Sequence, residues 1–362
     1  MAAEPARLNG PAATTSDAVT LGARVWLAAT VTATVAAAVA AVALAPPRSA
    51  PAPEGLAFLL FVGSSVHVAS TAWFYTVPDV RAYMRQHKAR YVWCPFALIT
   101  GAGAIAFVLP PPVLDWLLLP YFGWQIFHYQ KQNLGVAALA AASHGAGSLR
   151  RNERRALIAA GLAAVAGLLA RPSLLQLPVR PITPFLFPIA LLVFIGSVAV
   201  GLGCLAVRRP MQRPPGFCAA YLTSLVFCLP VFLFSSPYAA VAGLTIAHGL
   251  QYLTLMGLVA AGGQRGTGRL VQIAALCNIA LFGGALLSEA SDQLTARPEV
   301  RVLFGLFLGA VMAHFVIDAG LWRMREAFPR AFLGSRLPYL VPAPASPQAV
   351  RAPGLAQQRC NP

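Results

Sequence analysis

Charged residues are scarce in this sequence. They make up 10% of the 362 residues, whereas an average soluble domain has about 25%. The shortage extends over almost the whole length, and it excludes a soluble globular domain. Backbone that crosses a bilayer must satisfy its polar groups internally, and the unbroken apolar runs lack the short alternation of a membrane barrel. The composition therefore predicts an all-α fold, a polytopic bundle of transmembrane helices.

Lysine and acidic residues are few as well. The chain has 11 Asp and Glu against 27 Lys and Arg, only two of which, Lys88 and Lys131, are lysines, and its formal net charge is +16. In a soluble protein this surplus would point to nucleic acid. Here most of the arginine lies in short segments between apolar runs, where it reports topology and contacts anionic headgroups. We therefore expect a lipid bilayer, and no nucleic acid, as the partner of this charge.

Several motifs of known chemistry are missing. None of the six cysteines stands in a CxxC pair, and five of them lie in apolar runs, as small buried side chains would. The sequence contains no P-loop, no GxSxG and no HExxH. Any chemistry must therefore be carried by residues dispersed along the chain.

Apolar runs of about twenty residues, the length that a helix needs to cross the hydrocarbon of a bilayer, follow one another along the chain. We predict about ten spans in one membrane domain, residues 23–325. A disordered N-terminal segment, 1–22, precedes it, and a proline-rich tail, 326–362, follows it. The predicted spans are 25–45, 55–76, 91–110, 113–142, 156–171, 184–206, 217–234, 237–261, 269–288 and 300–322.

The distribution of basic residues orients these spans. With the N-terminus inside, arginine and lysine cluster in the inner segments around 81–90, 150–155, 208–213 and 265–269. Every inner loop is then at least as basic as any outer loop, as the positive-inside rule requires. The pattern predicts that both termini are cytoplasmic and that the protein is a multi-pass protein of the bacterial inner (plasma) membrane.

Four histidines fall inside predicted spans, whereas His87 and His144 fall in or beside inner loops. The spans that contain them are the second, fourth, eighth and tenth, which all run from outside to inside. At about 1.5 Å rise per residue, each histidine lies roughly 17–23 Å below the outer end of its helix. One layer near the midplane could therefore hold all four imidazoles. The residues are His67, His128, His248 and His314.

Polar side chains accompany these histidines on their own helical faces. Among those at offsets of three or four residues from a histidine, the candidates for catalytic roles are Lys131, Gln132, Gln251, Tyr252 and Asp318. Ionisable groups in mid-membrane cost about 2.5–3.5 kcal/mol each, so their accumulation indicates function. A single membrane histidine beside a glutamine is as often an interhelical hydrogen bond. We interpret the four together, with Lys131 and Asp318, as a functional site.

The chemistry of this set favours a metal ion. Imidazole is the commonest metal ligand, and because it is neutral when it binds, it tolerates a low dielectric. Three or four imidazoles with a carboxylate and open positions suit iron, and could also suit copper or zinc. We predict a non-haem iron site, mono- or dinuclear, whose ligands are His67, His128, His248, His314 and Asp318.

The other polar side chains would support the metal. Ligating histidines usually donate their second nitrogen to a carboxylate, amide or carbonyl. Gln132, Gln251 and Asp318 could accept these bonds. Lys131 would balance charge or deliver protons, and Tyr252 could carry protons or electrons.

Single histidines on separate membrane helices resemble the arrangement in membrane carotene-cleaving oxygenases, which hold one iron between helices in this way. The four positions that would correspond are His67, His128, His248 and His314. Integral membrane oxygenase-like proteins of azoxy natural-product clusters are similar in setting. The HxxxH and HxxHH boxes of membrane fatty-acid desaturases are missing. The resemblance implies an iron-dependent oxygenase.

We therefore expect a membrane-embedded oxygenase or oxidoreductase that acts on a small or lipid-soluble substrate, with bacterial natural-product biosynthesis as a candidate setting. A cytoplasmic electron donor is a candidate partner. Three alternatives stay open. Paired axial histidines would make a b-type haem electron-transfer protein. A relay of Lys131, Asp318 and the histidines would serve a proton-coupled transporter, although no internal repeat is visible. Histidine and aspartate could also act as acid and base in a lipid-modifying transferase.

Overall fold

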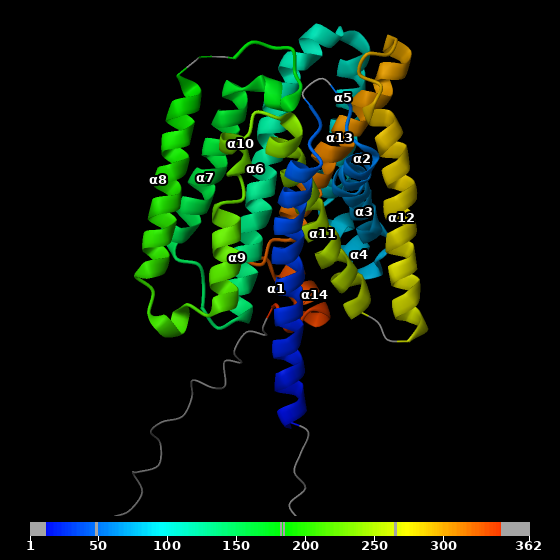
Figure 1. The fold of residues 1–362 in the computed structure, drawn as a ribbon. Helices are drawn as coiled ribbons and strands as arrows, with labels where there is room; N and C mark the ends of the chain where they lie inside the picture. Colours follow the sequence, from blue (N-terminus) through cyan, green and yellow to red (C-terminus); the bar gives the residue numbers. More distant parts are fainter. Residues whose placement is uncertain (1–11, 48–49, 182, 184, 264–265, 342–362) are drawn as a thin grey trace, which may run out of the picture.

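The computed structural model describes residues 12–47, 50–181, 183, 185–263 and 266–341, and every regular element in this part of the chain is helical. The predicted all-α fold is confirmed. The helices run side by side in one bundle (Figure 1). Within the described residues, seven helical runs are long and apolar enough to cross a membrane. The fold is therefore that of a polytopic membrane bundle.

The seven runs coincide with seven of the predicted spans. The second run is a helix interrupted by a π-helical turn at Val62–Val66, and two other runs begin with such a turn, at Ala89–Trp93 and Tyr238–Ala242. The α-helices of the seven runs are α1 (Ala12–Ala43), α2 (Glu54–Phe61) with α3 (His67–Ser70), α5 (Cys94–Val108), α8 (Leu186–Ala206), α11 (Gly243–Gly262), α12 (Thr267–Ser291) and α13 (Pro298–Leu321).

The other three predicted spans are helical but fall short of the length or apolarity of a candidate span. The fourth is α6 (Pro111–Ser143), which is long but carries the polar run around His128. The fifth is α7 (Arg151–Ala170), whose first turn is charged. The seventh is divided into α9 (Pro215–Leu225) and α10 (Pro230–Leu233), where a proline that lacks a backbone donor starts the second piece. The count of about ten spans is therefore met only in part.

Both predicted tails are partly helical. Residues 1–11 and 342–362 lie outside the described part of the chain, but α1 already begins at Ala12. At the other end, the chain forms α14 (Ala327–Arg336), because Phe332 and Leu333 find a buried apolar site there. Arg336 holds the helix in place by donating a 2.9 Å hydrogen bond to the carbonyl of Val259 in α11.

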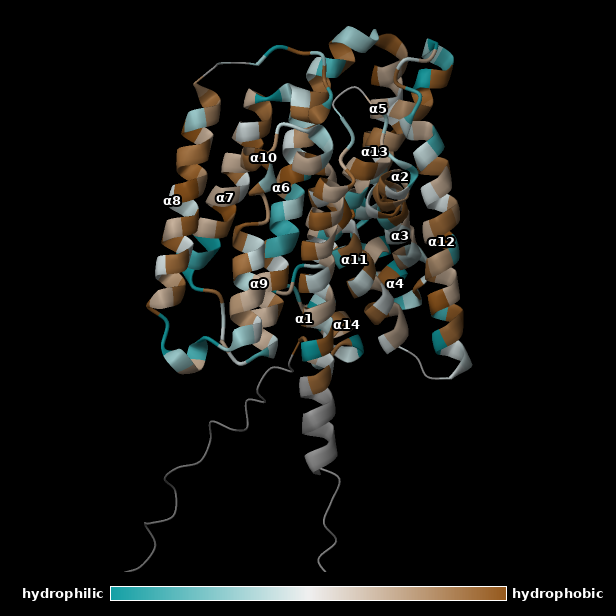
Figure 2. Ribbon diagram, viewed as in Figure 1, coloured by the Kyte–Doolittle hydropathy of each residue, from teal (hydrophilic) through white to brown (hydrophobic). Residues whose placement is uncertain are grey.

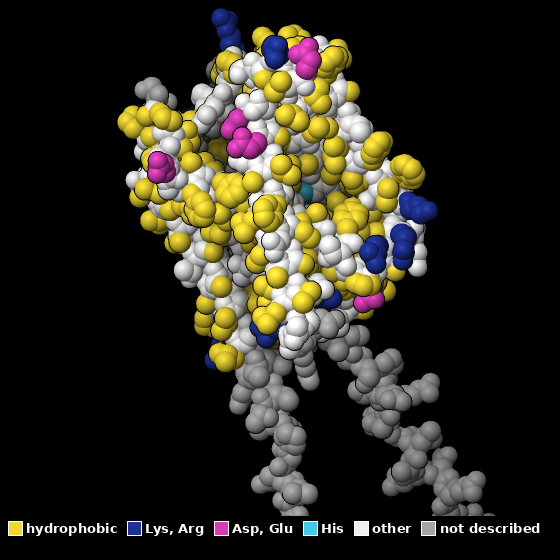
Figure 3. Space-filling view, turned by 90° about the vertical axis from the view of Figure 1, so that its right-hand side faces the viewer, with side chains coloured by type: hydrophobic (Ala, Val, Ile, Leu, Met, Phe, Trp, Pro, Cys, Tyr) yellow, Lys and Arg dark blue, Asp and Glu magenta, His cyan; other side chains and the backbone are white. Residues whose placement is uncertain are grey.

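Two groups of helices make up the bundle. Helices α6 to α10 lie on one side, and α2 to α5 with α11 to α13 lie on the other; α4 spans Pro78–Gln86 (Figure 1). Helix α1 packs against α11 and also contacts α6 and α9. The outer helices α8 and α12 are strongly hydrophobic (Figure 2), and hydrophobic side chains cover most of the face on the α12 side (Figure 3). An apolar exterior of this kind suits a bundle surrounded by lipid.

A glycine contact brings the second run against α11. A Cβ on Gly63 would collide with the backbone of Ile246, and a Cβ on Gly249 would collide with the backbone of Gly63. Glycine is therefore required at both positions for the two backbones to touch. His67 lies one turn after Gly63 and His248 directly precedes Gly249, so this crossing also sets how closely the two imidazoles approach.

A buried ion pair joins the first turn of α7 to the residues just after α8 in the other helix group. Glu153 in the first turn of α7 is 0% exposed, and Arg208, just after α8, is 3% exposed. The guanidinium donates two bonds to the carboxylate, one of 2.7 Å from Nη2 to Oε2. It also donates to the carbonyls of Ala146 and Ser148 at 2.7 and 2.9 Å, and the carboxylate accepts the backbone N–H of Arg150 at 2.7 Å. We call these two side chains the Glu153–Arg208 clamp.

Candidate metal centre

The four membrane histidines come together between four helices. His67 is the first residue of α3, His128 lies on α6, His248 on α11 and His314 on α13. The ring of His67 is centred 4.9 Å from that of His248 and 5.0 Å from that of His314. The ring of His128 is centred 5.1 Å from His248 and 5.4 Å from His314. The imidazoles therefore form one compact group, which we call the histidine cluster.

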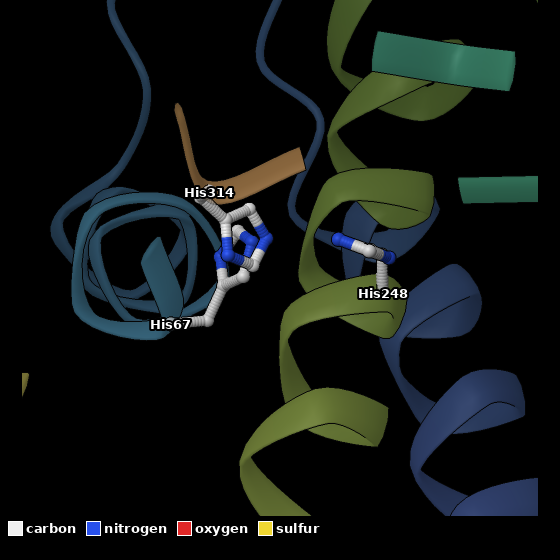
Figure 4. A group of neighbouring side chains, drawn as sticks. All are labelled: His67, His248 and His314. Carbon is white, nitrogen blue, oxygen red and sulfur yellow. The ribbon is translucent and has the colours of Figure 1, made fainter. Parts of the chain in front are cut away.

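Two sets of side chains in this cluster could each hold a metal ion. One consists of His67, His248 and His314, and Figure 4 shows one nitrogen of His248 directed toward the other two rings. The second consists of His128, His314 and Asp318. In each set the potential ligand atoms all lie within 4.8 Å of one another. A protein with seven candidate membrane spans thus contains a buried histidine group that could bind a metal, whose identity the group alone does not fix.

The ring nitrogens of the cluster are largely without partners. Both nitrogens of His67 and of His248, and Nε2 of His128 and of His314, are buried and make no hydrogen bond to any described residue. A buried polar atom without a partner costs about 1–3 kcal/mol, and most buried side-chain polar atoms have a partner. A metal ion bound by the cluster could engage one nitrogen of each of these four rings.

A chain of hydrogen bonds surrounds His314. Thr71 Oγ1 lies 2.6 Å from Nδ1 of His314 and 2.9 Å from the hydroxyl of Tyr252. The Tyr252 hydroxyl lies 2.9 Å from Asp318 Oδ1 and donates to it, while the other carboxylate oxygen lies 3.5 Å from His314 Nε2. Nδ1 is therefore engaged by the threonine, and Nε2 remains for a ligand beside a carboxylate that has an open oxygen.

Two aromatic rings stack on the imidazoles of His248 and His128. Tyr129 stacks on His248 with a centroid distance of 4.1 Å and an interplanar angle of 24°. Phe315 stacks on His128 at 4.2 Å and 26°. Stacking fixes the ring planes without using a nitrogen, so the donor atoms stay available for a ligand.

The two glutamines predicted to hold the histidines do something else. Gln132 donates 2.9 Å bonds to the backbone carbonyl of His248 and to the side-chain oxygen of Gln251. Gln251 in turn donates to Thr34 Oγ1 in α1 at 2.8 Å and to Asn133 Oδ1 in α6 at 3.3 Å. Neither amide bonds to a ring nitrogen in the described structure. The two amides connect α1, α6 and α11 beside the cluster and so position it.

Lys131 is not brought into the cluster. Its side chain is exposed, whereas His67, His248 and His314 are buried and His128 is half-buried. The helical period explains the difference, because Gln132 lies about 40° to one side of His128 and Lys131 about 60° to the other. The buried face of α6 is on the Gln132 side. Lys131, three residues after His128, therefore lies on the exposed side of α6.

The five residues expected as ligands, Asp318 among them, thus lie together with Tyr252 beside them, and the structure adds residues that had no assigned role. Thr71 is the hydrogen-bond partner of His314. Its position four residues after His67, on the same helical face, is the sequence signal that places it near the cluster. The stacking of Phe315 on a histidine from another helix leaves no sequence signal.

The cluster could bind a cation through neutral nitrogens, accept a proton on Asp318, and pass one along the hydroxyls of Tyr252 and Thr71.

No protein-family model, curated protein or solved structure matches this chain.

Proposed function

We propose that the protein is a membrane-embedded, non-haem iron oxidoreductase whose metal is held by the histidine cluster. The observation that carries the proposal is the set of six buried ring nitrogens without hydrogen-bond partners. Neutral imidazole is a strong ligand for iron, copper and zinc. Iron is favoured because His128, His314 and Asp318 provide two histidines and one carboxylate, the ligand composition of many non-haem iron oxygenases.

A single ion accounts for both ligand sets. They share His314, whose Nδ1 is bonded to Thr71, so that Nε2 is the nitrogen left to bind. One imidazole nitrogen binds one metal ion. We therefore propose a mononuclear site, with His67 and His248 as further ligands, Asp318 as ligand or base, and Tyr252 as the proton donor to that carboxylate.

The oxygenase class rests on the likeness of this arrangement to carotene-cleaving membrane oxygenases. Such an enzyme would take a small or lipid-soluble substrate and O₂, and an iron ion would supply the means of activating O₂. Insertion of both oxygen atoms into the substrate needs no external reductant. Insertion of one atom needs two electrons and two protons to reduce the other to water. A cytoplasmic electron donor would be a partner only in the second case.

Packing of the cluster disfavours the haem alternative. The ring of His67 has His248, His314 and Tyr252 around it, with centroids at 4.9, 5.0 and 5.8 Å. A porphyrin that faced any one of these rings would overlap its neighbours. The relay of the transporter alternative loses support because Lys131 is exposed.

We also propose ten crossings and cytoplasmic termini. The described chain begins and ends at the same end of the bundle (Figure 1), which requires an even number of crossings. Seven runs are candidate spans, so α6, α7 and α9 with α10 would supply three more. The membrane domain would cover 23–325, with 1–22 and 326–362 in the cytoplasm of a bacterial cell and the plasma membrane as the bilayer.

Metal analysis of detergent-purified protein tests the proposal. We expect about one iron per chain, because the two ligand sets share one nitrogen of His314. We also expect no Soret band, because the proposed site is non-haem. His67→Ala, His248→Ala and His314→Ala should each lose the iron. His144→Ala is the matched control, because its ring bonds Ser143 and Ala140 outside the cluster.

Three results would contradict the proposal. A Soret band would assign the protein to the haem class. Iron that survives in all three cluster variants would place the metal elsewhere. Folded wild-type protein that binds no metal after incubation with ferrous iron would end the redox hypothesis.

A further inference from the structure

The exposed side of α6 carries an ionisable side chain beside the half-buried ligand of the cluster. Trp124 is 39% exposed, His128 is half-buried, and Lys131 and Gly135 are exposed. These residues recur every three or four positions, so they form one stripe along the helix. The opposite side of α6 is buried and includes Gln130 and other polar side chains. We call this exposed row the α6 stripe.

With α6 as one of the proposed crossings, Lys131 lies in the stretch of the helix that the bilayer would surround. At about 1.5 Å per residue it is roughly 18 Å along the axis from Ser143 at the inner end and roughly 30 Å from Pro111 at the outer end. Among the described residues, the ion pairs involve other side chains and leave this lysine without a carboxylate partner. A cation at such a depth is costly and normally has a partner or a task.

The stripe borders the seam between α6 and α13. Trp124 contacts Phe315 of α13 with ring centroids 5.5 Å apart, and His128 stacks on the same phenylalanine. Trp124 at the helix surface and the buried ring of Phe315 thus lie next to His128, whose Nε2 has no partner. Beyond Lys131, a Cβ on Gly135 would meet nothing within 4 Å. The surface is open there to a molecule in the bilayer.

We propose that Lys131 binds the carboxylate of a long-chain, lipid-soluble acid that reaches the cluster sideways from the bilayer. The acid would lie along the α6 stripe, with its apolar chain on Trp124, outside the buried ring of Phe315. Lys131 lies one helical turn after His128, so the carbon atoms nearest the carboxylate would lie nearest the metal. This inference rests on the proposed function and names the substrate class of that site.

A carboxylate fits this position better than the phosphate of a phospholipid. The lysine lies well inside the inner end of α6, and a single-chain acid can bring its head group to that depth. A two-chain phospholipid keeps its head group at the interface. In a low dielectric, a charge-assisted bond between ammonium and carboxylate is stronger than at an exposed surface.

Photocrosslinking of the full-length protein in lipid nanodiscs tests the inference. The probe is a long-chain fatty acid with a diazirine in its chain, and its methyl ester is the uncharged control. We expect saturable labelling of α6 and α13 by the acid, reduced about tenfold in Lys131→Gln, as loss of one charge-assisted bond predicts. Lys131→Arg should retain labelling. Lys88→Gln, which removes the chain's other lysine on the inner loop, should not change it.

Metal content is measured on the same samples. Lys131→Gln should keep its iron, so that lost labelling cannot come from a damaged cluster. Equal labelling by acid and ester, or equal labelling of wild type and Lys131→Gln, would overturn the inference and leave the metal proposal intact. Competition by phosphatidylglycerol alone would assign the lysine to a headgroup and overturn it as well. Lysine-dependent labelling of a protein that binds no metal would support the acid site and refute the proposed function.

Discussion

The bundle contains two buried polar groups that differ in one respect. In the Glu153–Arg208 clamp, carboxylate and guanidinium bond each other and the neighbouring backbone, so both charged groups are fully engaged. In the histidine cluster, six ring nitrogens have no partner in the described structure. The clamp joins the ends of two helices, α7 and α8, whereas the cluster lies between four helices.

The difference separates stabilisation from binding. A polar group whose bonds are all made within the protein has nothing left to offer a ligand, and its role is to hold helices in place. A polar group that the fold buries and leaves unsatisfied lowers stability unless something else binds it. Burial is therefore a poor guide to function, and the inventory of unused donors and acceptors is a better one.

Breaking the clamp should have the largest effect. Arg208→Ala leaves the carboxylate of Glu153 buried and uncompensated, which costs about 3–5 kcal/mol of unfolding free energy. Thermal unfolding followed by circular dichroism in detergent measures it. Arg209→Ala, at the exposed neighbouring residue, should change little. Replacing the whole pair, as Arg208→Met with Glu153→Leu, should recover only part of the loss, because Ala146, Ser148 and Arg150 would still lose their backbone bonds to the pair. Full recovery would mean that these backbone bonds contribute little.

Replacing a histidine of the cluster should raise the unfolding free energy of the metal-free protein, whereas breaking the clamp lowers it. His67→Leu removes two unpaired nitrogens from a site that is 3% exposed, so metal-free protein should gain about 1–3 kcal/mol while losing its ability to bind metal. The same unfolding experiment, after chelation, reads the gain. His144→Leu is the control, because its ring is already hydrogen-bonded. If metal-free His67→Leu is less stable than metal-free wild type, the imidazole has a structural role.

A smaller effect should follow from Thr71→Val. The change keeps the shape of the side chain and removes its contacts with His314 and Tyr252. Loss of a hydrogen bond that orients a metal ligand typically lowers metal affinity about 10–100-fold. Competition with a chelator measures the affinity. Thr76→Val, where the hydroxyl bonds only the carbonyl of Trp73, is the control. Unchanged affinity would show that the stacked rings alone orient the ligands.

Much of the fold follows from the sequence, because apolar runs of membrane-crossing length have few alternatives to a helix. All ten predicted segments fall on helices, and seven of them as candidate spans. The division of 217–234 at Pro230 and the π-helical turn before His67 depend on packing and could not be located as precisely. The amphipathic helix α14 lies in the segment predicted to be a tail. Its apolar residues are buried only against the rest of the bundle, so the segment alone does not indicate a helix.

The candidate site was predictable in composition and less so in geometry. Burying histidines in lipid-facing spans carries a cost that sequence alone reveals, which identified all four. Their convergence depends on which helices become neighbours, and sequence spacing does not encode that. Offsets of three and four residues from His128 point to different sides of α6, so Gln132 faces inward and Lys131 faces outward.

The separation of the cluster's residues along the chain has a consequence for biogenesis. Thr71 and His314 touch although they are 243 residues apart in sequence, and α13 is the last of the candidate spans to be synthesised. A membrane chain that has not yet inserted α13 has no complete binding site, whatever the metal supply. Acquisition of the ion would therefore follow insertion of the whole bundle, and holding metal would mark a molecule whose assembly is finished.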